Sequence, residues 1–525
     1  MATYSIIIRN GLVFDGTGTP PRIDDIGIID DKIKKMGDLS ADKAPTVIDA
    51  ANKYVCPGFI DITTHSDTHW TIFSYPSQES FIRQGVTTII GGHGGSSLAP
   101  LVKAADIETI QKWIDVSKIN VNWQSMKEFL VELERHPLGV NFGTFVGYGT
   151  IRRGIIGDEI RPAKNDEIAQ MQYLTKKSLE EGAFGFSTNF GAAHQKPTSD
   201  EEIIAILNVV KTAKAITSHH LEDEGKDILP AISRLISLTR NSGVRSHIAH
   251  FKAIGRTAWG FFSRGLEMIE GVRKEGIEIT CDFFPYTRTG SNLYLLLPDW
   301  TREAGKKHIL ELIRGKERKH LIDSLKDFTL HYDKIVIAST RHDLDGIGKS
   351  IQALAQNSGR EPEDVVLDLL DVNDLQVAIF NEAILEKNIE LLAAKNYSMI
   401  ASDGAGYSLD YRVKTDLPHP RSFGSFPRIF AKLVKEKEVL SWEEAIYKMT
   451  GFPAKTLGIS GRGIIEKEAY ADIVVFDPET ITDRADYINP CQSAAGIEYV
   501  LINGAIALKE NALVAANKGR VLRSR

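Results

Sequence analysis

The sequence predicts an α/β fold, a (β/α)8 TIM barrel with a small β-sandwich domain built from both ends of the chain. Apolar strand-like segments alternate with helical segments through the middle of the chain, which is the pattern of a parallel sheet. Eight such segments are present, and eight strands are enough to close a barrel. Both chain ends consist of short strand-like segments without a long helical period.

The two β-rich ends carry turn signals between their apolar runs. Residues 1–57 contain Asn-Gly at 10–11 and Asp-Asp at 30–31, and residues 458–525 contain Asn-Gly at 503–504. Such pairs favour the tight turns of β-hairpins. We therefore expect a hairpin at each place and one small β domain made from the two ends.

The middle of the chain, residues 58–457, holds the predicted barrel. Its strand segments are rich in apolar and β-branched residues and span 58–63, 86–91, 140–146, 183–188, 215–219, 244–249, 277–284 and 397–402. Helical segments such as 165–181 and 201–213 lie between them. The interval 288–395 is too long for one crossover and contains two further apolar runs, so we interpret it as an insertion that covers the site.

Composition and charge exclude several classes of protein. Hydrophobic residues make up 42% of the 525 and charged residues 25%, as in ordinary globular proteins. A net charge of −6 gives no electrostatic support to a nucleic-acid partner, and no apolar run approaches the ~20 residues that span a bilayer. No signal peptide is recognisable, and three cysteines are too few for a disulfide framework. We expect a cytoplasmic protein with a small-molecule partner, as a monomer or an oligomer.

Residues 57–70, PGFIDITTHSDTHW, place potential metal ligands directly after the first strand segment. Thr63, His65, Asp67 and His69 occupy every second position, and alternate residues of an extended backbone point to one face. Imidazole and carboxylate are the ligands that Zn²⁺ accepts in hydrolytic sites. The alternative is a solvated loop that happens to hold two histidines.

The ends of other predicted strands carry the same residue types. His93 lies in the Gly-rich sequence GGHGGSS, His220 and His250 follow the fifth and sixth segments, and Asp403 follows the last. Catalytic groups of barrel enzymes lie at the C-terminal ends of strands. This shared position, in a chain with only 14 histidines, favours a metal site. The predicted ligands are His65, His93, His220, His250 and Asp403.

The chemistry follows from these ligand types. A divalent metal lowers the pKa of a bound water and polarises a carbonyl. Asp403 is the candidate acid/base that takes a proton from this water and delivers it to a leaving amine. Ligand histidines need acceptors that fix their tautomers. Asp67, Glu222 and Glu224 are candidates, and an ordinary surface carboxylate is the alternative for each.

Polar side chains near the predicted strand ends are candidates for binding substrate. Lys252 is two residues past a predicted ligand and is placed to hold an anionic group. Tyr286, Arg288 and Ser291 follow the seventh strand segment. Arg341 and His342 lie within the predicted insertion and are weaker candidates.

The chain resembles the N-acyl-D-amino-acid deacylases, or D-aminoacylases, of the amidohydrolase superfamily. The resemblance covers nearly the whole chain and rests on motifs in that family's order: PGFID, GVTT, SLAP, GAFGFST, LEDEG, AHFKA, FPY, LLPDW, ASDG, HPRSFGSFPRIF, TGFPA, GRG and ADIVVFDP. It implies the barrel and the β domain, and zinc-dependent hydrolysis of the amide of an N-acyl-D-amino acid. It implies that His220 and His250 are zinc ligands, that Asp403 is catalytic, and that Lys252 matches the family's lysine.

Several positions depart from the family pattern. The family has His-x-His after the first strand, where this sequence has Thr63 and His65, and it has a cysteine ligand in the loop that here contains His93. Phe284 stands where the family has the first Tyr of Tyr-Pro-Tyr, and NFGAAHQKP replaces a Tyr-rich stretch. Since imidazole is a good zinc donor and a threonine hydroxyl a poor one, we expect one tightly held metal on His93, His220 and His250.

Two other functions remain open on the sequence alone. The altered pocket segments are compatible with an amidohydrolase acting on a cyclic or peptide-like amide. Thr63 and the missing cysteine are compatible with a non-catalytic amidohydrolase-fold assembly protein. Against the second alternative, the predicted ligands and Asp403 are present together.

Overall fold

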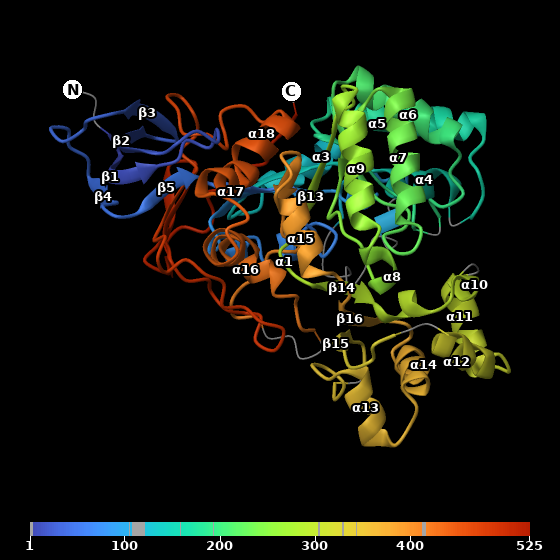
Figure 1. Cartoon of the computed structure of the whole chain (residues 1–525). Helices are drawn as coiled ribbons and strands as arrows, with labels where there is room; N and C mark the ends of the chain where they lie inside the picture. Colours follow the sequence, from blue (N-terminus) through green and yellow to red (C-terminus); the bar gives the residue numbers. More distant parts are fainter. Residues whose placement is uncertain are drawn as a thin grey trace.

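The computed structural model describes residues 4–103, 106–107, 121–157, 159–192, 194–302, 305–327, 330–342, 344–411 and 416–524. Figure 1 shows three parts: a central α/β barrel, a β domain that contains the N-terminus, and a smaller lobe that projects below the barrel. No helix within the described ranges is long and apolar enough to cross a membrane. Cys56 and Cys281 are buried, Cys491 is half-buried, and all three are free thiols.

The barrel strands are parallel and follow one another in chain order, as predicted. They are β6 (Phe59–Asp61), β7 (Val86–Gly91), β8 (Asn141–Thr144) continued by β9 (Val146–Gly147), β10 (Gly185–Asn189), β11 (Ile216–His220), β12 (Arg245–Ile248), β13 (Ile279–Phe283) and β17 (Ser398–Ile400). A bridge between Thr64 and Gly404 joins the end of the last strand to the end of the first. The His65 N–H also donates to the Gly404 carbonyl at 2.7 Å. These contacts close the barrel.

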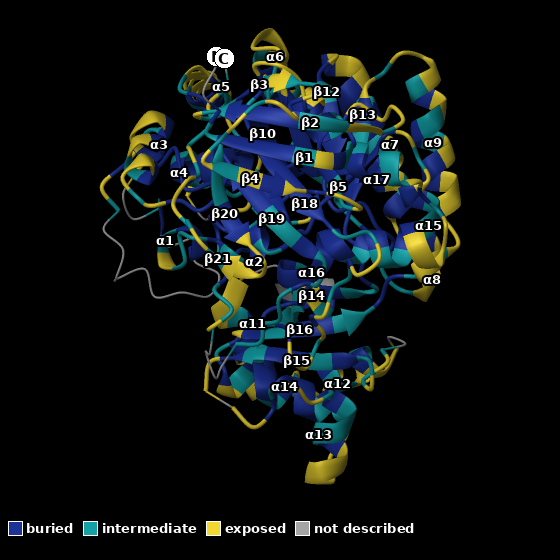
Figure 2. Ribbon diagram, turned by 90° about the vertical axis from the view of Figure 1, so that its left-hand side faces the viewer, coloured by how far each residue is buried: buried dark blue, intermediate teal, exposed yellow. Residues whose placement is uncertain are grey.

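Helices surround the strands, and Figure 2 shows exposed outer faces on α9 and α15. The helices of this layer are α1 (Thr71–Ser74), α2 (Glu79–Ile82), α3 (Met126–Glu134), α4 (Tyr148–Ile156), α5 (Asn165–Glu180), α6 (Asp200–Thr212), α7 (Ile228–Ser242), α8 (Arg256–Trp259), α9 (Phe262–Lys274), α15 (Glu386–Ala393), α16 (Arg421–Arg428), the π-helix η4 (Ile429–Glu436), α17 (Trp442–Met449) and α18 (Gly451–Leu457). The two predicted helices are α5 and α6. The Ser199 hydroxyl caps α6 by accepting the Glu202 N–H.

The two chain ends form one β domain, as predicted. Its strands are β1 (Ile6–Val13), β2 (Arg22–Ile29), β3 (Lys32–Met36), β4 (Thr46–Asp49), β5 (Tyr54–Pro57), β18 (Ile473–Phe476), β19 (Ile497–Ile502), β20 (Ala505–Lys509) and β21 (Ala512–Leu513). Eight of them hydrogen-bond in a single path from β21 to β3, and β4 pairs with β1 beside this path. The Ile33 N–H of β3 donates to the Ala469 carbonyl, just before β18, so the sheet curls around its own apolar core.

Two of the three predicted hairpins are confirmed. The turns at 30–31 and 503–504 join β2 to β3 and β19 to β20. The hairpin at 10–11 is wrong, because β1 runs straight through these residues. Asn10 has φ 60° and the register shifts here, so the pair forms a bulge. Gly11 permits close packing, since a Cβ there would lie 2.4 Å from Val55 Cγ2.

The predicted insertion forms the projecting lobe, with an antiparallel sheet and its own apolar core. The lobe contains β14 (Arg288–Asn292), η3 (Leu293–Leu296), α10 (Asp299–Arg302), α11 (Gly305–Arg314), α12 (Arg318–Asp327), β15 (Ile335–Thr340), α13 (Ile351–Ser358), α14 (Pro362–Val372) and β16 (Val377–Glu382). Strands β15 and β16 are the two extra apolar runs. Helix α15 follows this lobe in sequence but packs on β13, β17 and α9 of the barrel.

Candidate active site

The candidate site lies where the barrel strands end. His220 is the last residue of β11, His250 follows β12 by two residues, and Asp403 follows β17 by three. His250 and Asp403 both adopt left-handed backbone, with φ 41° and 52°. Non-glycine residues rarely adopt this conformation, and such residues are found at functional sites. The barrel therefore brings residues far apart in sequence to one rim.

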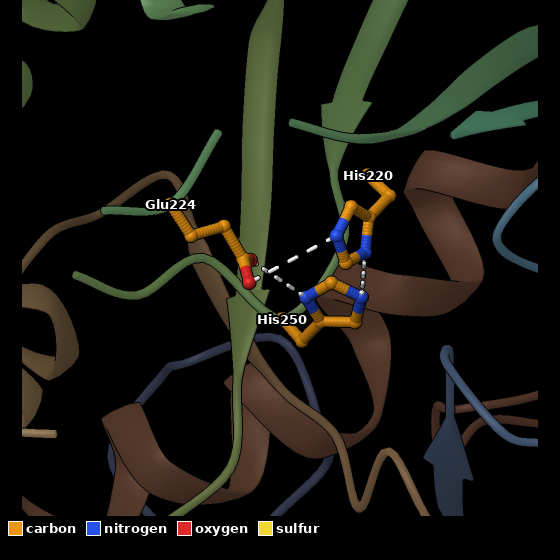
Figure 3. Close-up of side chains that lie close together, drawn as sticks. All are labelled: His220, Glu224 and His250. Carbon is orange, nitrogen blue, oxygen red and sulfur yellow. Dashed lines mark hydrogen bonds and ion pairs between the residues drawn. The ribbon is translucent and has the colours of Figure 1, made fainter. Parts of the chain in front are cut away.

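Two histidines and one carboxylate form a compact group at this rim (Figure 3). His220 Nδ1 lies 2.9 Å from His250 Nε2, and a Glu224 oxygen lies 3.2 Å from His250 Nδ1. The other Glu224 oxygen is 3.9 Å from His220 Nε2. Among the described residues this is the single group of His, Cys, Asp or Glu side chains with metal-ligand spacing, all within 4.8 Å of one another.

The electrostatics of the group suit metal binding. Burial lowers the pKa of His220 to about 3, so at neutral pH its imidazole is in the form that binds a cation. Burial alone would raise the pKa of Glu224. The Lys252 ammonium, His220 and His250 outweigh this effect and hold that pKa below its usual range, so the carboxylate is charged.

Asp403 lies beside this group and is held by two partners. Its Oδ1 is 2.9 Å from His65 Nε2, and its Oδ2 accepts a hydrogen bond from the Arg421 guanidinium. Burial would raise the pKa of Asp403, but Arg421 and the imidazoles of His250 and His65 lower it well below its usual range. Asp403 is thus ionised and oriented.

His93 is not a member of the compact group. It is buried, its Nδ1 lies 3.1 Å from Ser218 Oγ, and its Nε2 has no hydrogen-bond partner in the described part of the chain. Its ring contacts Phe145 edge-on with centroids 4.9 Å apart. The structure therefore groups Glu224, in place of the expected His93, with His220 and His250.

Thr63 is engaged elsewhere as well. Its hydroxyl donates to Asp282 Oδ2 at 2.6 Å, and His247 Nε2 lies 2.7 Å from the same oxygen. Asp282 Oδ1 accepts the backbone N–H of His250 at 2.8 Å. This buried network supports the backbone of a candidate ligand and leaves the Thr63 hydroxyl committed to a carboxylate.

Comparison with known proteins gives the family. A sequence model described as the amidohydrolase family matches residues 405–507. A D-aminoacylase from Alcaligenes xylosoxydans xylosoxydans is 30% identical over 99% of this chain and 97% of that protein. The chain belongs to the D-aminoacylase family of amidohydrolases. An N-acyl-D-glutamate deacylase from the same organism is 28% identical, over 99% of this chain and 96% of the relative.

Solved structures agree with this D-aminoacylase family assignment and with the predicted fold. The crystal structure of N-acyl-D-glutamate deacylase from Bordetella bronchiseptica, with zinc and a phosphonate inhibitor, has a TM-score of 0.83 at 26% identity and covers 100% of both chains. A D-aminoacylase crystal structure has a TM-score of 0.82 at 29% identity, over 99% of this chain and 100% of that one. Another D-aminoacylase structure is described in terms of a binuclear metal centre with one-metal activation and second-metal attenuation.

In this D-aminoacylase-family chain, the residues predicted to bind substrate already contact other parts of the protein. Lys252 Nζ is buried, 2.7 Å from Glu224 Oε1 and 2.8 Å from His250 Nδ1. The Arg288 guanidinium pairs with Glu382 at 3.2 Å. The hydroxyl of buried Tyr286 donates to the Pro420 carbonyl at 3.3 Å, and half-buried Ser291 lies opposite Ile379 in the lobe sheet. Arg341 and His342 are exposed residues of the lobe.

The candidate acceptors for ligand tautomers have different roles. Glu224 contacts His250 directly. Asp67 accepts the Gly92 N–H at 2.7 Å and so holds the loop that contains His93. Glu222 pairs with Arg234 at 2.8 Å and is not a member of the compact group.

Arg421 is a functional candidate that its sequence position does not reveal. It follows the last strand by 21 residues and reaches Asp403 from the first residue of α16. Its position in the HPRSFGSF sequence is a signal that can be recognised only with the D-aminoacylase family pattern in hand.

Buried His219 gives the fold a predictable acid sensitivity. Its Nδ1 and Nε2 lie 2.8 Å from the hydroxyls of Thr188 and Thr217, and burial lowers its pKa to about 3. In the unfolded chain this imidazole has a pKa near 6.5 and binds a proton more readily than in the folded protein. The free energy of unfolding that is present above pH 6.5 therefore decreases as the pH falls toward 3. We expect the free energy of unfolding of His219→Gln to fall less steeply with decreasing pH than that of the wild type, by about 1.4 kcal/mol per pH unit.

The measurement is urea unfolding at pH 7 and pH 5 in the presence of a chelator. His320→Gln, at an exposed histidine of the lobe, is the matched control and should leave the pH dependence as in the wild type. An equal pH dependence in wild type and His219→Gln would show that His219 is not the responsible group.

Proposed function

We propose that this protein is a zinc-dependent amidohydrolase that removes the acyl group from an N-acyl-D-amino acid. The observation that carries the proposal is the compact group of His220, Glu224 and His250 next to the ionised Asp403 in a D-aminoacylase-family barrel. The donor set is two imidazoles and a carboxylate, which is a ligand set that hydrolytic zinc enzymes use.

The residues fit a single zinc ion. His220 and His250 would hold it, with Glu224 either as the third ligand or as the outer partner that holds the Lys252 ammonium against His250 Nδ1. When bound, zinc supplies Lewis acidity toward a carbonyl oxygen and lowers the pKa of water. We propose one tightly held metal because the Thr63 hydroxyl is committed to Asp282.

Asp403 is proposed as the general base and acid. Its carboxylate is ionised, so it can take a proton from the attacking water and later deliver it to the leaving amine. His65 and Arg421 hold its two oxygens and so fix its direction. The second sequence-predicted role of Asp403 and His65, as metal ligands, is compatible with their position beside His220 and His250.

The lobe strand β14 is proposed to bind the substrate's polar groups. Arg288, Tyr286 and Ser291 lie on or next to this strand, and Arg288 is half-buried above the Tyr487 ring at 4.5 Å. Lys252 is proposed to contribute a positive potential, because its ammonium is paired with Glu224 at 2.7 Å. The three free cysteines support a cytoplasmic location.

The test is a panel of substrates assayed together with metal analysis. We expect release of free amino acid from N-acetyl-D-amino acids, a lower rate on the L-enantiomers, and about one zinc per chain. Turnover of cyclic amides alone would redirect the proposal to another amide substrate. Absence of bound metal together with absence of turnover would favour a non-catalytic assembly protein.

A further inference from the structure

Residues 416–421, here named the linking segment, join the lobe to the catalytic carboxylate. Near the start of the segment, the Leu417 N–H donates to the Ala338 carbonyl of β15 at 2.8 Å. At its other end, the Arg421 guanidinium donates to Asp403 Oδ2. One short stretch of backbone therefore contacts the lobe sheet and the catalytic site.

His419, in the middle of the linking segment, uses both ring nitrogens. Its Nε2 lies 3.0 Å from the Arg288 carbonyl oxygen of β14, and its Nδ1 accepts the Arg421 N–H at 3.0 Å. A carbonyl requires a donor and an N–H requires an acceptor, so both bonds are satisfied only by the neutral tautomer with the proton on Nε2. Burial, and then the charge of Arg421, lower the pKa of His419 well below its usual value.

The surroundings of His419 hold the ring in one orientation. Tyr286, Phe380 and Tyr487 meet the ring edge-on at centroid distances of 5.4, 5.1 and 5.1 Å. Tyr286 follows the barrel strand β13, Phe380 belongs to the lobe, and Tyr487 lies between the β-domain strands β18 and β19. All three parts of the molecule thus converge on this imidazole.

Strand β14 also lies directly over the linking segment. A Cβ at Gly290 would be 3.7 Å from an Arg421 guanidinium nitrogen and 3.8 Å from His419 Cδ2. Any displacement of this strand therefore changes the environment of the arginine that contacts Asp403.

We propose that His419 is a positioning residue that couples docking of the lobe to the placement of Arg421 on Asp403. The imidazole ties the lobe backbone at Arg288 to the Arg421 backbone, so the carboxylate receives its cationic partner when β14 is seated. The proposal rests on the proposed role of Asp403. It adds that the lobe, besides the substrate contacts proposed for β14, completes the arrangement of groups around Asp403.

Three variants separate the two hydrogen bonds from packing. His419→Phe keeps an aromatic ring and removes both bonds. His419→Asn keeps an acceptor near the position of Nδ1 but is too short for Arg288, and His419→Gln keeps a donor near the position of Nε2. Phe380→Leu is the matched control, because it alters packing on the ring and neither hydrogen bond.

The first measurement is hydrogen–deuterium exchange on the full chain, which does not depend on activity. In His419→Phe we expect faster exchange in peptides covering 288–292 and in those covering 416–424, with metal content and the other barrel peptides unchanged. Phe380→Leu should leave the 416–424 peptides as in the wild type. Faster exchange on one side only would overturn the coupling. If His419→Phe does not fold, His419→Asn and His419→Gln provide the same comparison.

The second measurement is a double-mutant cycle on kcat, with His419→Phe, Arg421→Gln and the double variant. We expect His419→Phe to lower kcat about tenfold or more. Because His419 acts through Arg421, the double variant should be no slower than Arg421→Gln alone. If the double variant lost kcat by the product of the two single factors, His419 and Arg421 would act independently and the proposal would be overturned. If the wild type turned over no amide, the proposed function would fail, and the exchange experiment would still decide the coupling.

Discussion

Replacing Asp403 with asparagine is expected to lower kcat/KM by roughly 10²- to 10⁴-fold, the range that a general base or acid contributes. An amide has nearly the shape of the carboxylate but cannot accept the proton of the attacking water. The Arg421 guanidinium would also lose its charged acceptor in a buried place. The measurement is steady-state kinetics on the best substrate of the panel, together with zinc content and circular dichroism.

Asp410→Asn is the matched control for this experiment. Asp410 is exposed and lies seven residues further along the same segment. It should retain wild-type kinetics. A fully active Asp403→Asn enzyme would remove Asp403 from the mechanism. Loss of zinc in the same variant would show that the Asp403 carboxylate is also a metal ligand.

The barrel could be predicted because its determinants are local. Short apolar segments such as VTTIIG at 86–91 are buried on both faces, so their composition alone marks them as strands. The C-terminal ends of parallel strands must meet at one rim. His220, His250 and Asp403 could therefore be placed together from their positions relative to predicted strands, before any distance was known.

The remaining features depend on contacts between distant residues. Asn10 and Gly11 have the composition of a hairpin turn, but pairing of β1 with β2, β4 and β5 holds them in a bulged strand. His93 follows a strand like the other candidates, yet its ring turns to Ser218 and Phe145. The position of a residue relative to a strand predicts where its backbone lies. The direction of a side chain in a Gly-rich loop depends on the residues packed around it, which come from other parts of the chain.

The contacts of the charged side chains were not predictable for the same physical reason. Glu224 is four residues beyond His220 in an irregular loop, so sequence spacing alone does not aim its carboxylate at His250. Arg421 follows Asp403 by 18 positions, and Leu417, between them, contacts the lobe. Lys252 lies beside His250, and the charge of Glu224 makes it part of an internal ion pair.

Replacing His220 with alanine is expected to weaken zinc binding by more than about 100-fold, because loss of an outer partner of a ligand already costs 10- to 100-fold. The imidazole nitrogen 2.9 Å from His250 Nε2 would be removed, and one of the donors of the compact group with it. Competition with a chromophoric chelator measures the affinity. Elemental analysis after gel filtration measures the content per chain.

Glu224→Gln, analysed in the same way, distinguishes the two roles of Glu224. If Glu224 is a ligand, its replacement should weaken zinc binding as much as His220→Ala does. If Glu224 is the outer partner of Lys252 and His250, its replacement should cause only the smaller loss of an outer partner. His331→Ala, at an exposed histidine of the lobe, should bind zinc as the wild type does. Wild-type zinc affinity in His220→Ala would show that the metal binds away from the rim formed by the ends of β11 and β12. The orphaned Nε2 of His93 would then become the next nitrogen to test.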